Sequence, residues 1–489
     1  MIVEATFLNL SGTGLIRDCG YQGRCVNLML WLVIKKEILE HLLSLRFAIS
    51  AILCFVVIIS SIWVLTRDYK ENLLDYHTNT VMHHNEVLGY GERQAWRITR
   101  AEVKVDKPLN PLEIFFSNPQ QRGNVTAKVG IRSQPEFERA HEENPIIYLF
   151  SIMDLRFFIG IIMGLLALVF SYDAVSGEKE SGTLRLVLSY SIPRDTLLLG
   201  KWIGGYLSLI FPFLLAVISS LIIVVAFPEV RLHSQHWLGL GIILLISFLY
   251  ISALYSLGIF VSTRTSMAST SITTLLLLWI VMVLVIPNIS PYIASQIHPL
   301  SSMQELQREK MELQRDTMKK WRQEWIEHRE ESEKNNIPRE KWWEGFRDRE
   351  EELLNWKYSQ EEKLENHFKK ALAKQVNISK NISRISPFSS LTLSITELAG
   401  IGSQEMNRFW KEVVRYQGTL KDYVYENVPK WQEQGWENID LSDYPRFHYE
   451  ESRLTDRIKN SLIDILILIM WSVVFFMGAY LSFLRYDVR

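Results

Sequence analysis

The sequence predicts a mainly α-helical, polytopic membrane protein with six transmembrane helices. The chain has 489 residues, of which 48% are hydrophobic and 22% charged. Its mean hydropathy is only +0.04, because long apolar runs alternate with segments dense in Lys, Arg, Glu and Asp. A bilayer core about 30 Å thick needs about 20 mainly apolar residues in a helix. Apolar runs of that length occur six times, and the charged segments between them predict a small mixed α/β extracytoplasmic domain and a larger helical one.

The positive charges that flank the apolar runs predict how the protein is oriented in the membrane. Lys and Arg gather before the first run, between the second and third, between the fourth and fifth, and after the sixth, whereas the short loop 228–236 has only Arg231. Loops rich in Lys and Arg stay in the cytoplasm. Both termini are therefore expected to be cytoplasmic, in a multi-pass protein of a bacterial inner or plasma membrane. The predicted spans are residues 47–65, 152–170, 197–227, 237–261, 269–286 and 462–484.

Residues 1–46 are predicted to form a cytoplasmic N-terminus that contains a helix over 31–45. Apolar residues recur on one face of this helix, and Lys and Glu fill much of the remainder. Such a helix can lie in the membrane interface; the alternative is a helical extension of the first span. Met29 stands directly before the helix and is an alternative start to Met1, which sequencing of the mature N-terminus would decide.

Two extracytoplasmic domains follow from the segments between the spans. In residues 66–151, the alternating runs 96–105 and 124–131 predict short strands. In residues 287–461, apolar residues recur at helical spacing from 300 to 376, interrupted at Pro338. Because proline suits the first turn of a helix, this second domain is expected to contain a long helical hairpin.

The segment 171–196 between spans two and three is the strongest functional signal. It contains Gly177-Glu-Lys-Glu-Ser-Gly-Thr-Leu184, preceded by Asp173 and followed by Pro193-Arg194 and Gly200-Lys201. Composition alone leaves a partner-binding helix and a solvated loop about equally plausible. The pattern resembles the coupling segment of ABC-2 type transporter permeases, in the subgroup with large extracytoplasmic loops. Arg194-Asp195 departs slightly from the usual Ser-Arg, and the resemblance covers about residues 31–290 and 460–489.

The resemblance implies a transport subunit that works with a separate ABC ATP-binding subunit and a second permease chain, identical or paralogous. The chain has no Gly-x-x-x-x-Gly-Lys-Ser/Thr phosphate loop, so ATP is expected to act through the partner, with no cofactor bound directly and no catalytic residue here. Glu178, Glu180 and Arg185 are the expected polar docking contacts, with Leu184, Leu186 and Leu188 seating the helix. The full predicted coupling set is Asp173, Glu178, Lys179, Glu180, Gly182, Thr183, Leu184 and Arg185.

Weaker signals lie at the spans themselves. Asp154 and Arg156 form a candidate membrane polar site, because an ionisable group in a span is a functional hypothesis; the favoured alternative is a structural pair or side chains that reach the headgroups. Small residues four apart at Gly160 and Gly164, and at Gly200 and Gly204, suit close helix packing, within the chain rather than between two permeases.

Other classes of site are disfavoured. The histidines at 77, 83 and 84 lack the spacing of a zinc site, so no metal is expected. A net charge of −1 gives no sign of a nucleic-acid partner.

The sequence thus predicts a permease subunit that couples ATP hydrolysis by another subunit to export of an unidentified substrate across the lipid membrane. The alternative is a mechanotransmission subunit, which drives an extracytoplasmic protein partner through its large outer domain without passage of a substrate. A membrane-anchored enzyme or receptor is a third class, and it predicts that no ATPase co-purifies.

Overall fold

The computed structural model describes residues 22–93, 95–99, 101–117, 125–131, 133–138, 153–189, 192–436 and 439–486. Met1 lies outside the described residues, whereas Met29, the alternative start, lies within the helix Gln22–Leu42. The chain divides into two compact units. The span unit comprises residues 1–129, 135–286 and 384–489, and the hairpin unit comprises residues 130–134 and 287–383.

Six helical segments are long and apolar enough to cross a membrane, which confirms the predicted number of spans and the mainly helical fold. Two of them contain a π-helical turn, η3 and η4, where one extra residue widens the helix. The segments are α3 (Leu45–Arg93), α5–η3–α6 (Leu155–Phe157, Phe158–Met163, Gly164–Ser171), α9 (Arg194–Val225), α10 (Ser234–Arg264), α11–η4–α12 (Ala268–Trp279, Ile280–Val285, Ile286–Ile297) and α17 (Leu454–Leu484).

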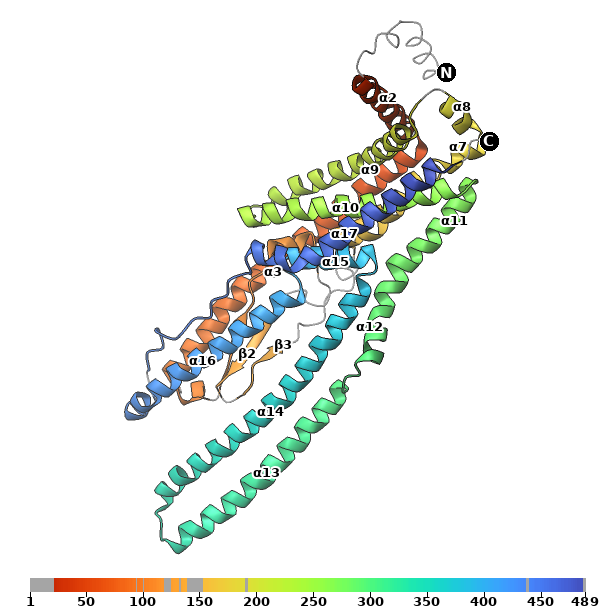
Figure 1. Cartoon of the computed structure of the whole chain (residues 1–489). Helices are drawn as coiled ribbons and strands as arrows, with labels where there is room; N and C mark the ends of the chain where they lie inside the picture. Colours follow the sequence, from red (N-terminus) through yellow and green to blue (C-terminus); the bar gives the residue numbers. More distant parts are fainter. Residues whose placement is uncertain are drawn as a thin grey trace. The chain divides into compact units, whose positions relative to one another are not determined.

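Helix α2 (Gln22–Leu42) is separate from α3, with a turn at residues 43–44, and it packs along α9 (Figure 1). Two glycines of α9 make this close approach possible. A Cβ at Gly200 would lie 2.5 Å from Val33 Cγ1, and one at Gly204 would lie 2.7 Å from Glu37 Cβ. The small residues four apart therefore serve packing within the chain, as the sequence favoured.

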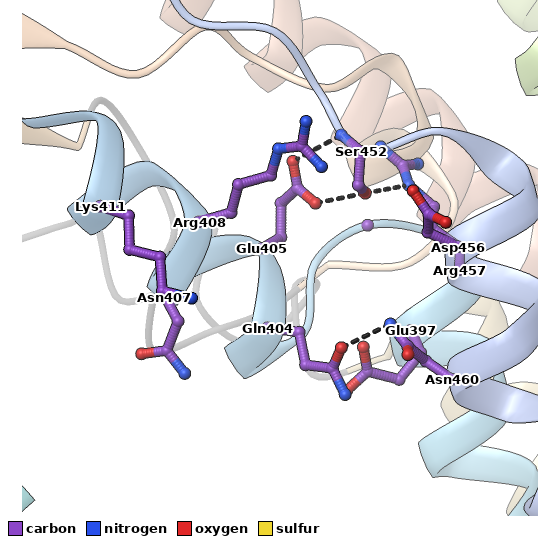
Figure 2. A pocket seen from close by; sticks show the side chains of 11 residues that line it. Glu397, Gln404, Glu405, Asn407, Arg408, Lys411, Ser452, Asp456, Arg457 and Asn460 are labelled. Carbon is purple, nitrogen blue, oxygen red and sulfur yellow. Dashed lines mark hydrogen bonds between the residues drawn. The ribbon is translucent and has the colours of Figure 1, made fainter. Parts of the chain in front are cut away.

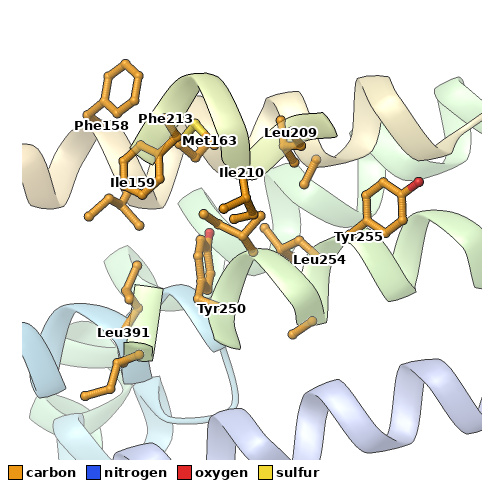
Figure 3. Close-up of a cluster of buried hydrophobic side chains, with 14 of the residues drawn as sticks. Phe158, Ile159, Met163, Leu209, Ile210, Phe213, Tyr250, Leu254, Tyr255 and Leu391 are labelled. Carbon is orange, nitrogen blue, oxygen red and sulfur yellow. The ribbon is translucent and has the colours of Figure 1, made fainter. Parts of the chain in front are cut away.

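The core of the span unit is apolar and lies between α6, α9, α10 and α17. Phe158 and Phe213 stack with centroids 6.3 Å apart, and the Tyr250 hydroxyl donates to the Gly160 carbonyl at 2.6 Å (Figure 3). A short helix, α15 (Pro387–Leu398), packs against α10 and α17, and its Leu391 side chain is fully buried. Nothing in the sequence indicated that α15 belongs to this core, since 12 residues are too few to span a membrane.

A three-stranded sheet of order β1-β2-β3 accounts for the predicted small α/β domain. Strands β2 and β3 are antiparallel, with Thr126 opposite Glu138. The predicted strand 96–105 is only partly extended, because its first half forms η1, and residues 66–93 continue the helix α3. The elements are η1 (Ala95–Thr99), β1 (Glu102–Asp106), η2 (Pro111–Ile114), β2 (Thr126–Gly130), β3 (Glu136–Glu138) and the later helix α16 (Ser403–Glu433).

The hairpin unit contains α13 (Met303–Lys334) and α14 (Arg339–Ser383), which run side by side (Figure 1). The helical spacing predicted this pair. Lys310 forms an ion pair with Glu365 at 2.5 Å, and Trp321 meets Phe346 edge to face at 5.7 Å. At 1.5 Å per residue the helices are about 48 and 68 Å long.

Candidate coupling site

The segment between α6 and α9 folds into two short helices, α7 (Ser176–Glu180) and α8 (Thr183–Ser189). Gly182 stands between them with φ +75° and open space around its Cα, so a glycine suits the sharp change of direction. We call residues 172–180 the hub segment, because it contacts the ends of many surrounding helices.

The first hub contact is a buried cation held between two carboxylates. Lys201 Nζ of α9 lies 2.9 Å from Glu37 Oε1 of α2 and 2.7 Å from Glu178 Oε1 of α7. The Lys201 side chain is 4% exposed, so its charge depends on these two partners. Burial raises the pKa of Glu37, but the adjacent Lys201 ammonium outweighs burial and lowers that pKa below its ordinary value of 4.5. Lys36 of α2 adds a longer contact to Glu178 at 3.7 Å.

The second contact joins the hub segment to the start of α3. Arg46 Nη1 donates to Asp173 Oδ2 at 2.7 Å, and Arg46 Nη2 donates to the Tyr172 hydroxyl at 2.9 Å. The guanidinium also lies 5.0 Å from the centroid of the Tyr172 ring. These side chains are partly exposed, so the pair positions the segment more than it stabilises the fold.

The third group of contacts joins α7 to α10. Ser262 Oγ accepts hydrogen bonds from the backbone N–H groups of Val175 at 3.0 Å and Ser176 at 2.9 Å, which caps the start of α7. Lys179 Nζ donates to the carbonyls of Thr263 at 2.5 Å and Thr265 at 3.1 Å. A cation there complements the negative end of the α10 dipole.

The remaining hub contacts reach α11 and the residues after α17. Glu180 Oε2 accepts from the backbone N–H of Ala268, the first residue of α11, at 2.9 Å. Lys179 Nζ lies 4.6 Å from the centroid of the Tyr486 ring. The hub segment therefore contacts α2, α3, α9, α10, α11 and Tyr486, which follows α17.

The structure divides the predicted coupling residues into two sets. Asp173, Glu178, Lys179 and Glu180 hold the hub contacts inside the chain. The residues exposed in and around α8 include Gly182, Thr183, Arg185 and Leu186, the last 60% exposed. Leu184 is buried and Leu188 is partly buried.

Comparison with known proteins shows the family to which this chain belongs. A family model described as ABC-2 family transporter protein matches residues 31–488. The chain belongs to the ABC-2 transporter family. It is a multi-pass membrane permease, and because permeases of this family have no ATPase domain, membership implies an ATP-binding subunit as partner.

Two curated relatives share part of the permease sequence. The probable ABC transporter permease protein NosY of Pseudomonas aeruginosa is 36% identical over 111 residues, which are 22% of this chain and 40% of that protein. The protein of the same name from Stutzerimonas stutzeri is 39% identical over 77 residues, 16% of this chain and 28% of that protein. The matched regions span less than half the length of either relative.

The two residues of the candidate membrane polar site, Asp154 and Arg156, make hydrogen bonds within the chain. Asp154 is fully buried and caps α5 by accepting from the Phe157 N–H at 2.8 Å. Arg156 donates to Thr396 Oγ1 of α15 at 3.2 Å and to the Ser117 carbonyl at 3.1 Å. These contacts fasten the start of this span to its neighbours.

Several residues that contact the hub segment were absent from the predicted coupling set. Lys201 was recognised only as part of Gly-Lys, although a lysine inside an apolar run requires an acidic partner. Glu37, Arg46 and Ser262 come from other helices, and nothing in their local sequence indicates the contact. Among the described residues, no group of three His, Cys, Asp or Glu side chains is placed to hold a metal ion; His83 instead pairs with Asp106 at 2.8 Å.

Proposed function

We propose that this permease couples ATP hydrolysis by a separate nucleotide-binding subunit to export of a substrate, and that α7 and α8 receive the movement of that subunit. The observation that carries the proposal is that residues 172–180 contact five helices and Tyr486, which follows α17. A short segment with so many contacts can pass one displacement to most of the span unit.

In this proposal the two sets of residues have different tasks. The exposed set at α8, with Arg185 and Leu186, docks on the ATP-binding subunit. The inward set, with Glu178 and Glu180, transmits the displacement to the spans. The positive flanks of the spans support a cytoplasmic position for both helices and both termini, and a second permease chain completes the working unit.

The test uses the exposed set, because substitutions there leave the hub contacts intact. The variant Arg185→Glu/Leu186→Asp should lose capture of the ATP-binding subunit and stimulation of its ATPase activity, with an unchanged melting temperature. The matched control is Lys319→Glu/Met318→Asp on α13, where Lys319 is 77% and Met318 57% exposed. Wild-type capture by the α8 variant would contradict the docking role.

Charge reversal at Glu178 and Glu180 is a poorer test of docking. Glu178→Lys would place a second cation beside the buried Lys201, and Glu180→Lys would remove the acceptor for the α11 N-terminus. Either change disturbs the fold of the span unit, so loss of the partner would not distinguish docking from folding.

The mechanotransmission alternative draws support from the chain that leaves α14. Arg384, the residue directly after α14, donates to both oxygens of Asp464 in α17 at 2.7 and 3.1 Å. α15 then continues into the core of the span unit. From Arg384 onward, the chain that follows α14 is therefore fixed within the span unit.

The two functions differ in what ATP drives. Export predicts ATP-dependent movement of a compound across proteoliposomes that contain the complete complex. Mechanotransmission predicts no such movement, together with ATP-dependent capture of an extracytoplasmic protein by the full-length permease, which deletion of residues 303–383 would abolish.

A further inference from the structure

A charged cavity lies at the N-terminal end of α17 (Figure 2), and its volume is about 360 Å³. The coupling site contacts Tyr486, which follows the other end of this helix. The cavity is bounded by the end of α15, the first turns of α16, the residue Ser452 before α17 and the first turns of α17. Its charges balance: three acidic side chains and three basic ones line it. These are Glu397, Glu405, Asp456, Arg408, Lys411 and Arg457.

Internal hydrogen bonds hold the inner charges of the cavity in place. Arg457, with a side chain 7% exposed, donates from Nε to Ser452 Oγ at 2.8 Å and from Nη2 to Glu451 Oε2 at 3.1 Å. Ser452 Oγ in turn donates to Glu405 at 2.5 Å. Gly400 has φ +70°, and a Cβ there would lie 2.5 Å from Arg457 Cζ, so the guanidinium lies directly against the backbone.

The outer charges of the cavity are accessible to a ligand. Lys411 of α16 and Asp456 of α17 are exposed, and Arg408 is partly exposed. The cavity thus offers cations on one wall and a carboxylate on another. Its size falls at the lower end of the range for small-molecule sites, about 300–1,000 Å³.

An apolar stripe on α17 continues from the cavity. Asp456 and Asn460 line the cavity, and residues three and four positions further along a helix stay on the same face. Ile463, Met470 and Val474 continue that face and are 55%, 50% and 51% exposed. Asn460 and Ile463 are less than one helical turn apart, so the charged cavity passes directly into an apolar surface of a membrane span.

We propose that the cavity binds the headgroup of a zwitterionic phospholipid with a primary amine, a phosphatidylethanolamine, whose acyl chains lie along the α17 stripe. The phosphate receives charge-assisted hydrogen bonds from Arg408 and Lys411. The ammonium donates to Asp456. Balanced charge favours this lipid over an anionic one, and a quaternary amine could not donate the hydrogen bonds that the carboxylate accepts.

The occupant is a lipid because the stripe and the cavity are continuous. A second copy of the chain would cover the apolar stripe but would have to bury six charges of the cavity as well. Burying charges without matched partners is costly. A phospholipid supplies both the apolar chains and the two opposite charges, and the bilayer supplies it at high concentration.

The test measures lipids bound to the full-length permease by native mass spectrometry, after equilibration with vesicles of equal parts phosphatidylethanolamine, phosphatidylcholine and phosphatidylglycerol. Wild type should retain phosphatidylethanolamine in preference to the other two. Arg408→Gln/Lys411→Gln removes two charge-assisted contacts and should lower its retention about tenfold. The control Arg415→Gln/Lys430→Gln removes the same two charges from exposed positions of α16 outside the cavity and should retain wild-type levels.

Further measurements distinguish binding of the lipid headgroup from binding of its acyl chains. Ile463→Ala/Met470→Ala should lower retention of the lipid, and soluble glycerophosphoethanolamine should not displace it at equal concentration. Displacement by the soluble compound would overturn the role of the stripe. Equal retention of the three lipids, or equal loss in the cavity variant and its control, would overturn the site. A two-chain species without bound lipid would assign the stripe to a second copy and overturn the proposal as well.

Discussion

Replacement of Lys201 by methionine is the sharpest perturbation of the hub segment. Methionine keeps an unbranched side chain of similar length but removes the ammonium that lies 2.9 Å from Glu37 and 2.7 Å from Glu178. Two carboxylates from different helices would then face each other without a cation between them.

The expected loss of stability follows from burial. Lys201 is 4% and Glu37 8% exposed at the side chain, and breaking a buried ion pair by removal of one partner costs about 3–5 kcal/mol. Glu178 is 18% exposed, so water partly screens its charge and the lower end of that range applies, about 3 kcal/mol. The triple variant Lys201→Met/Glu37→Gln/Glu178→Gln leaves no buried charge and should recover most of the loss.

The assay is unfolding of the full-length permease in mixed micelles, followed by the fluorescence of its 15 tryptophans. Lys319→Met is the matched control, because Lys319 is 77% exposed in its pair with Asp316, and an exposed pair contributes at most about 1 kcal/mol. If Lys201→Met unfolds like wild type, or if the triple variant is no more stable than Lys201→Met, the reasoning about a buried, mutually dependent network is refuted.

Three further predictions concern the same region. Since the pKa of Glu37 is lowered, its carboxylate stabilises the fold above about pH 4.5 and this contribution fades as the pH falls through the lowered value; the difference in unfolding free energy between wild type and Glu37→Gln should therefore shrink in acid titrations. Gly204→Ala should cost about 1–3 kcal/mol in the same unfolding assay, because its methyl group would press on α2. Ser262→Ala removes the acceptor for two backbone N–H groups of α7 and should cost about 1–2 kcal/mol, with weaker stimulation of the partner ATPase.

Each of these has its own control. Gly241 also lies inside a helix but has no atom within 4 Å of an added Cβ, so Gly241→Ala should be neutral or slightly stabilising. A parallel loss in both glycine variants would point to helix flexibility rather than to packing of α2. For Glu37→Gln, a constant difference across the acid range would contradict its ionised state. Ser219→Ala, at a partly exposed serine of α9 whose hydroxyl donates to the Leu215 carbonyl of the same helix, should leave stability and ATPase stimulation unchanged.

The spans and the hairpin helices could be predicted because their signals are local. An apolar run of sufficient length predicts a span wherever it packs, and α13 and α14 show regular helical spacing on either side of Pro338. The extension of α3 to Arg93 was missed because apolar residues do not recur at a regular helical spacing in this polar segment. The packing of α15 in the span unit was missed because the sequence of a short apolar helix does not indicate which hydrophobic core it packs into.

The coupling role of the segment stays a prediction, and the sequence did not indicate where its acidic side chains point. The motif from Gly177 to Leu184 identified the segment, yet sequence alone suggested that Glu178 and Glu180 face a partner. Both carboxylates instead meet groups of the same chain, Lys201 and the Ala268 N–H. Such contacts join residues 23 and 88 positions apart, and only the packing of the helices brings them together.

The most direct measurement of the coupling role is photocrosslinking from α8 in the assembled complex. A photoreactive amino acid at Leu186, which is 60% exposed, should form an adduct with the ATP-binding subunit, whereas the same group at Met318 of α13, which is 57% exposed, should not. An intact complex in which position 186 forms no adduct, or in which both positions form it equally, would contradict the docking of α8 on that subunit.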